Sequence, residues 1–177
     1  MRRGFLAAAV LAVEGYLYWR YGARGALFHF WLHGLFGAAL GLSVGALLRC
    51  ARPQRRSGEA WSVGLAGHLY SAAPDIAFVA AGVLHYRWMD AFALHVSLHF
   101  VPAPLVVAFA VFALALLGHA AATLDRGAVA VALVGLAAVT TVAAVAGRAP
   151  IPQTLDEVRE PPRVALLCPL AGPSDAG

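Results

Sequence analysis

The sequence lacks lysine altogether, and acidic residues are scarce. Its 177 residues include 13 basic residues, all arginine, and 9 acidic ones, so that only 12% of the chain is charged. Ordinary soluble domains carry about 25% charged and about 45–50% apolar residues, whereas 61% of this chain is hydrophobic. A soluble fold of this length cannot bury so much apolar surface. The composition therefore predicts that lipid is the solvent for most of the chain.

Cysteine pairs and nucleic-acid motifs are also missing. The two cysteines are Cys50 and Cys168, and on the topology predicted below they face opposite sides of a membrane, which excludes a disulfide between them. The basic balance comes without an RNA- or DNA-binding motif, and arginines in membrane loops serve as orientation signals. We therefore expect the lipid bilayer, and no nucleic acid, as a partner.

Apolar runs of bilayer-spanning length predict an all-α integral membrane protein, a bundle of about five transmembrane helices within residues 1–148. Pro74 is expected to kink the third helix, and Pro102 and Pro104 to kink or interrupt the fourth. Residues 149–177 contain several prolines and are expected to form a partly disordered tail. The expected helices cover approximately residues 4–19, 26–48, 61–84, 91–118 and 127–146.

The arginines near the helix ends predict the orientation of the bundle. Seven arginines fall on one side and four on the other, and the positive-inside rule assigns the richer side to the cytoplasm. We therefore expect a multi-pass protein of the inner (cytoplasmic) membrane with a cytoplasmic N-terminus. The two sets are Arg2, Arg3, Arg49, Arg52, Arg55, Arg56 and Arg126 against Arg20, Arg24, Arg87 and Arg148.

Ionisable side chains within the predicted spans indicate a metal site, because each costs about 2.5–3.5 kcal/mol to insert. We estimate depths from alternating helix directions and a rise of about 1.5 Å per residue. On this estimate, ionisable side chains of four helices lie in the outer half of the bilayer. Two pairs have the form His-x-x-Leu-His, a spacing that places both imidazoles on one helical face. The residues in this layer are Glu14, His29, His33, Asp75, His95 and His99.

We expect His33, Asp75 and His99 to be the primary metal ligands. Asp75 is the strongest single candidate, because a carboxylate at that depth needs a cation, a proton or a donor network. His29 and His95 are expected to be additional ligands or to bind a second metal. Zinc suits this donor set, with iron or haem as the alternative. Helix packing is the alternative role for either histidine pair alone.

Other polar residues receive supporting roles. His68, two turns from Asp75, is expected to donate a hydrogen bond to a ligand or else to pack against a neighbour. His85, Glu14 and Asp90 are candidates for proton transfer. His119 receives no role, because it is expected at the opposite membrane surface, where an imidazole is hydrated.

The loop from His85 to Asp90 reads His-Tyr-Arg-Trp-Met-Asp and lies above the predicted ligands. Arg87 is a candidate for binding the head group of a substrate through its phosphate or carboxylate. The alternative is an interfacial anchor of Tyr, Trp and Arg that needs no substrate.

The segment from His29 to Pro104 resembles the inner-membrane metal-dependent hydrolases. These are small bundles with an early helix histidine, a Pro-Asp near the end of a helix and a later pair of histidines. Two motifs differ: Ala77 stands where a second Asp is usual, and the later histidines are farther apart. The matching residues are His33 with Gly34 and Gly37, Pro74 with Asp75, and His85, His95 and His99.

These observations predict a membrane-embedded metal-binding protein. The leading hypothesis is a metal-dependent hydrolase that acts on a lipid-borne or small amphipathic substrate near the outer face, with a metal-bound water as the nucleophile. One alternative is a haem or iron redox protein. The other is a non-enzymatic transporter or accessory subunit, although no inverted repeat supports a transporter.

Overall fold

The computed structural model describes residues 2–23, 27–52, 59–81 and 86–151. Over these ranges the chain is helical, which confirms the predicted all-α class. Of the expected tail, the structure describes residues 149–151. The elements are α1 (Arg2–Ala23), α2 (Leu27–Ala51), α3 (Ala60–Ala81), the 3-10 helices η1 (Arg87–Ala91) and η2 (Ser97–Phe100), α4 (Pro104–Thr123) and α5 (Gly127–Ala146).

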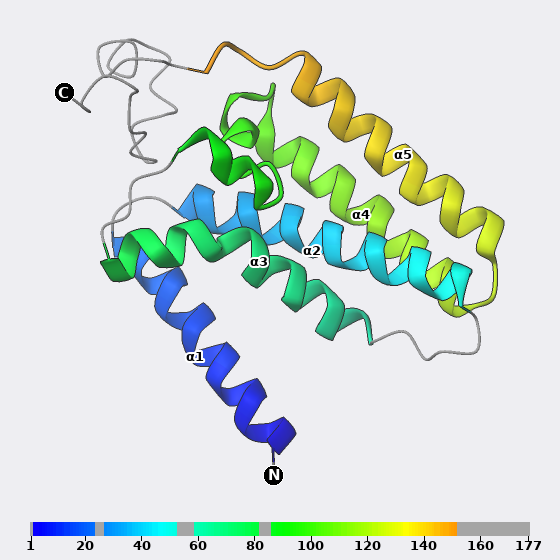
Figure 1. Cartoon of the computed structure of the whole chain (residues 1–177), viewed down its shortest axis with the longest axis horizontal. Coiled ribbons are helices and arrows are strands. Elements are labelled where there is room, and N and C mark those ends of the chain that lie inside the picture. Colours follow the sequence, from blue (N-terminus) through cyan, green and yellow to red (C-terminus); the bar gives the residue numbers. More distant parts are fainter. Residues whose placement is uncertain (1, 24–26, 53–58, 82–85, 152–177) are drawn as a thin grey trace.

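The helices form a bundle centred on α2. Figure 1 shows α2, α4 and α5 side by side, with α3 along another side of α2 and α1 leading away from the bundle toward the N-terminus. α2 and α4 run in one direction, and α3 and α5 run in the other (Figure 1). The start of α2, the end of α3 and the two 3-10 helices therefore share one end of the bundle.

Among the α-helices of the described residues, α2, α4 and α5 are long and apolar enough to cross a membrane. The outward faces of α4 and α5 are apolar as well: Val106, Phe109, Val139 and Val142 are each 63–70% exposed. α1 and α3 carry more polar residues, including Glu14 and Arg20 on α1 and Asp75 on α3.

A close backbone contact joins α2 to α3 through glycines. A Cβ atom on Gly37 would collide with the carbonyl oxygen of Gly67, and one on Gly67 would collide with the carbonyl oxygen of Gly37. One turn along α2, a Cβ on Gly41 would collide with the carbonyl oxygen of Val63. Only glycine permits this approach. The approach brings the start of α2 close to the end of α3.

The fourth helix, expected over residues 91–118, is interrupted at its prolines as predicted, but the residues before them do not form an α-helix. α4 begins at Pro104, and the residues before it form η1, a turn and η2. Proline has no N–H and fits the first turn of a helix but not its interior. The Asp90 carboxylate also accepts hydrogen bonds from the backbone N–H groups of Val96 and Ser97, at 2.9 and 2.8 Å, which removes these donors from a helical pattern.

The turn before His95 reverses the chain through the left-handed region. Ala93 and Leu94 have φ angles of 56° and 60°, a conformation that costs a non-glycine residue about 1–2 kcal/mol. The hydroxyl group of Tyr70 on α3 donates a 2.6 Å hydrogen bond to the carbonyl oxygen of Ala91. This contact fixes the end of η1 to α3.

The glycine contact predicts a selective effect of Gly67→Ala. The added methyl group collides with backbone rather than with a movable side chain, so we expect a loss of at least the 1–3 kcal/mol that overpacking costs. Gly135→Ala on α5 is the matched control, because its added Cβ meets nothing within 4 Å. Thermal unfolding in detergent measures both variants. Equal melting temperatures for the two would contradict this account of the α2–α3 contact.

Candidate metal centre

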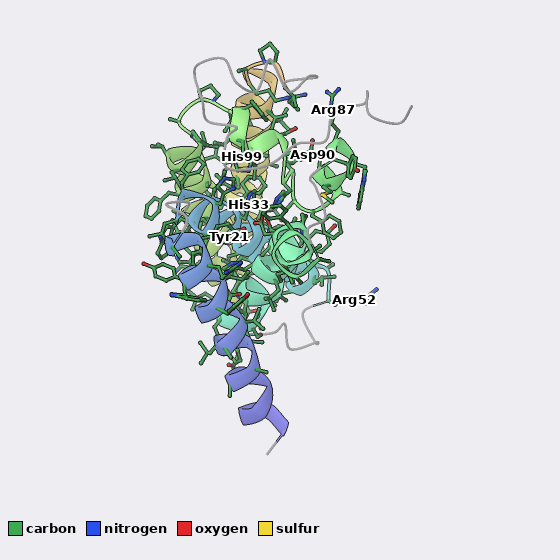
Figure 2. The ribbon with its side chains drawn as sticks, turned by 90° about the vertical axis from the view of Figure 1, so that its left-hand side faces the viewer. Tyr21, His33, Arg52, Arg87, Asp90 and His99 are labelled. Carbon is green, nitrogen blue, oxygen red and sulfur yellow. The ribbon has the colours of Figure 1, made fainter. Side chains whose placement is uncertain are left out.

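Five buried metal-type side chains meet at the end of the bundle where α2 begins and α3 ends. Each is at most 4% exposed. Their ligand atoms form two groups of three, within 4.8 Å of one another: His29 with His33 and His99, and His33 with Asp75 and His95. Figure 2 shows His33 and His99 toward the middle of the molecule. We call these five residues the cluster: His29, His33, Asp75, His95 and His99.

The backbone of α3 orients His95. Its Nδ1 lies 2.9 Å from the carbonyl oxygen of Ser71, and since a carbonyl only accepts, Nδ1 carries the proton and donates. A neutral His95 then presents its Nε2 lone pair, which lies 3.4 Å from Oδ1 of Asp75. A lone pair facing a carboxylate oxygen is repulsive unless a proton or a cation lies between them. Metal-binding histidines commonly use such a carbonyl bond to fix their tautomer.

The ligand atoms of His29, His33 and His99 lie close enough together to hold one ion. Nε2 of His33 lies 3.1 Å from Nε2 of His99, with the two rings inclined by 69°. His29 and His99 have ring centroids 4.5 Å apart, inclined by 45°. Two nitrogens bound tetrahedrally to one zinc ion at about 2.0–2.1 Å lie about 3.3–3.4 Å apart. The His33–His99 contact is a hydrogen bond between the two Nε2 atoms, and its length is close to the separation of two ligands on one zinc ion.

The His33, Asp75 and His95 group is less well arranged for a single ion. The rings of His33 and His95 are stacked, with centroids 3.8 Å apart and planes inclined by 12°. A metal lies in the plane of each imidazole that binds it, so two stacked rings cannot share an ion unless one turns. His95 is held by Ser71. His33 is thus the residue that would have to turn.

The prediction that His33, Asp75 and His99 share one ion differs from this arrangement. His33 belongs to both groups, but Asp75 is grouped with His95, and His99 is grouped with His29. The physical reason is the break in the fourth helix. Because residues 92–96 turn instead of continuing a helix, His95 reaches Asp75, with Nε2 3.4 Å from Oδ1, while the ring of His99 lies against that of His29.

Aromatic rings surround the cluster on the α1 side. The ring of Tyr21 is parallel to that of His29, with centroids 6.0 Å apart. Phe28 lies against both His29 and His99, at 5.9 and 6.2 Å. These rings help exclude water from the cluster, and exclusion of water strengthens electrostatic interactions within it.

Glu14 and His68 face each other outside both three-residue groups. Oε2 of Glu14 lies 3.4 Å from Nε2 of His68. The His68 ring also meets Phe30 edge-on at 5.3 Å, and it lies beside Gly34, where a Cβ would come within 3.0 Å of it. The contacts that position His68 therefore come from α1 and α2.

The candidates around the predicted loop have different surroundings. Asp90 accepts a 2.7 Å hydrogen bond from the Ser97 hydroxyl in addition to its two backbone bonds, so both of its oxygens support the loop. Arg87 lines an open pocket at the end of the bundle. His85 lies outside the described residues.

Two residues were misjudged from the sequence. His119 is buried, at 2% exposure, and not hydrated as expected, because its ring packs against Gly45 of α2, where a Cβ would approach it to 3.2 Å. The sequence predicts only an orienting role for Arg148, but this residue lines the same pocket as Arg87. Its place directly after an apolar helix was the available signal.

Metal retention is expected to separate His33 from His119. His33→Ala removes the residue common to both groups, so the purified protein should lose its metal. His119→Ala should keep the metal and lose about 1–3 kcal/mol of stability, because it empties a buried site away from the cluster. Elemental analysis and thermal unfolding of both variants distinguish the two effects. Loss of metal from both would indicate general misfolding.

The chain matches no family model, and searches of curated proteins and of solved structures return no match. The resemblance to metal-dependent hydrolases therefore stays a prediction from short motifs.

Proposed function

We propose that this chain is a membrane-embedded metalloprotein with a transition-metal ion held by His29, His33 and His99. The observation that carries the proposal is the convergence of inclined, buried imidazoles, with His33 and His99 at 3.1 Å. Burial of four histidines and a carboxylate in one place is costly without a cation or a complete set of hydrogen bonds. In this proposal α1 and α3 cross the bilayer together with α2, α4 and α5.

Zinc is the metal that this donor set favours. Three histidines and a free position make up a common catalytic zinc site, and imidazole also suits iron. A haem between His33 and His99 is disfavoured, because the axial nitrogens of one haem iron lie about 4 Å apart with the macrocycle between them, and these nitrogens are 3.1 Å apart. Binding would require the ligand atoms, now within 4.8 Å, to close to about 3.4 Å.

Hydrolysis is the activity that we propose for this centre. Zinc with three protein ligands supplies a bound water that is acidic enough to act as a nucleophile near neutral pH. Asp75 and His95 adjoin the three-histidine group through the His33–His95 stack. In the proposal this pair accepts the proton of the water or binds a second ion, and the substrate is lipid-borne or amphipathic.

Metal content is expected to depend on His29 more than on Asp75. Wild-type protein purified in detergent should contain about one zinc per chain by elemental analysis. His29→Ala should abolish retention, because it removes one of three ligands. Asp75→Asn, which keeps the shape of the side chain, should weaken zinc binding by about 10–100-fold at most. Retention by His29→Ala with complete loss from Asp75→Asn would instead assign the ion to the His33, Asp75 and His95 group.

Lipid hydrolysis is expected only from protein that contains metal. Wild-type protein, chelator-treated protein and the His99→Ala variant are incubated with an extract of membrane lipids, and the products are followed by mass spectrometry. Zinc-loaded protein should release a product that the other two do not, and added zinc should restore release to the chelated sample. Stoichiometric zinc without any metal-dependent product would overturn the hydrolase and leave the metal site.

A further inference from the structure

A pocket of about 700 Å³ opens at the end of the bundle that carries the cluster, and two arginines line it. Arg87 comes from η1 and Arg148 follows the last turn of α5. Both guanidinium groups are permanently charged. Nη1 of Arg148 donates a 3.0 Å hydrogen bond to the carbonyl oxygen of Val145, which uses one of five donors. The other lining residues are apolar: Val145, Ala146, Ala149, Pro150 and Ile151.

Two residues that line this pocket contact the segment that carries His95 and His99. The N–H group of Ala149 donates a 2.8 Å hydrogen bond to the carbonyl oxygen of Phe100, the residue after His99. Ile151 packs in one apolar cluster with Met89 and Val96, and Val96 follows His95. A ligand in the pocket therefore touches residues that themselves contact the segment carrying His95 and His99.

An apolar groove lies one turn before the pocket along α5. This second cavity, of about 310 Å³, lies between α2, α4 and α5 and reaches Ala93 and Leu94 in the turn before His95. Its last lining residues on α5 are Thr141 and Val142. The pocket begins one turn later at Val145, on the same helical face. The groove and the pocket that holds the pair of arginines are thus one helical turn apart on α5.

Aromatic side chains mark the level of the pocket relative to a bilayer. Trp88 is 63% exposed and Tyr86 is 45% exposed, on either side of Arg87. Exposed Trp and Tyr gather at the level of lipid head groups. Figure 2 shows Arg87 at the edge of the molecule, away from His33, as this level requires.

We propose that Arg87 and Arg148 bind the phosphate of an anionic lipid while one acyl chain occupies the groove beside α5. Arginine favours phosphate because its planar donors pair with two oxygens at once. Two guanidinium groups repel the ammonium group of a zwitterionic lipid, so the site selects net anionic head groups. The inference deepens the proposed function and rests on it in one respect: the bound lipid belongs to the substrate class of the metal centre.

Lipid selectivity tests the proposal. The protein is purified from membranes, exchanged into mixed micelles with equal phosphatidylglycerol and phosphatidylcholine, and its bound lipids are counted by native mass spectrometry. Wild type should prefer phosphatidylglycerol, and the double variant Arg87→Gln with Arg148→Gln should lose this preference by about 10–30-fold. Each single variant should lose part of it, which keeps the test open if the double variant does not fold.

A control of equal charge is available at the far end of the bundle. Arg52 and Arg126 are exposed and follow α2 or precede α5, so Arg52→Gln with Arg126→Gln removes the same charge without touching the pocket. This control should keep the preference. An equal loss in both double variants would overturn the site, since it would reflect net charge alone.

Further outcomes separate this site from the metal centre. Competition by inorganic phosphate alone, at concentrations similar to those of the lipid, would overturn the lipid assignment in favour of a free-phosphate site. Zinc is measured in the same samples, and the arginine variants should retain it. Lipid selectivity without zinc would refute the metalloprotein and not this site. Zinc without selectivity would refute this site and not the metalloprotein.

Discussion

The contact of α2 with α3 through Gly37 and Gly67 is the constraint on which the rest of the structure depends. With backbone touching backbone, no side chain separates the two helices along this stretch. The start of α2 and the end of α3 are then close enough for His33 and Asp75 to belong to one group of ligand atoms. A wider spacing, as leucine or valine would impose, moves α3 outward and separates the carboxylate from the imidazoles.

The segment before α4 completes the site because it is not a helix. The Asp90 carboxylate accepts hydrogen bonds from the N–H groups of Val96 and Ser97. The strained turn at Ala93 and Leu94 changes the direction of the chain. A continuous helix would carry His95 and His99 in one direction. In the non-helical segment, His95 instead donates a hydrogen bond to the Ser71 carbonyl, and His99 contacts His33. Strained backbone of this kind is commonly retained where it serves a site.

The sequence predicted the parts of the fold that depend on long apolar runs and on the alternation of helix direction. The bounds of α5 were predicted to the residue, and five of the six polar residues expected in one layer come together in space. The sixth, Glu14, faces His68 instead. The grouping of the five was not predictable, because the choice between Asp75–His99 and Asp75–His95 depends on a turn without glycine. The expectation that His119 is hydrated was wrong for a related reason. The depth of a residue along a helix does not determine whether its side chain faces the solvent or a neighbouring helix.

The carbonyl that orients His95 belongs to the main chain of Ser71, so the side chain at position 71 is not needed for this hydrogen bond. The Ser71 hydroxyl is buried with no hydrogen-bond partner among the described residues, and its Cβ lies where a side chain on Gly37 would need to be. Substitution at position 71 should therefore be limited by volume and indifferent to polarity. Alanine would preserve the tautomer of His95 as well as serine does. Which nitrogen of the buried His95 ring carries the proton is therefore determined by the main chain of α3 and not by the chemistry of any side chain.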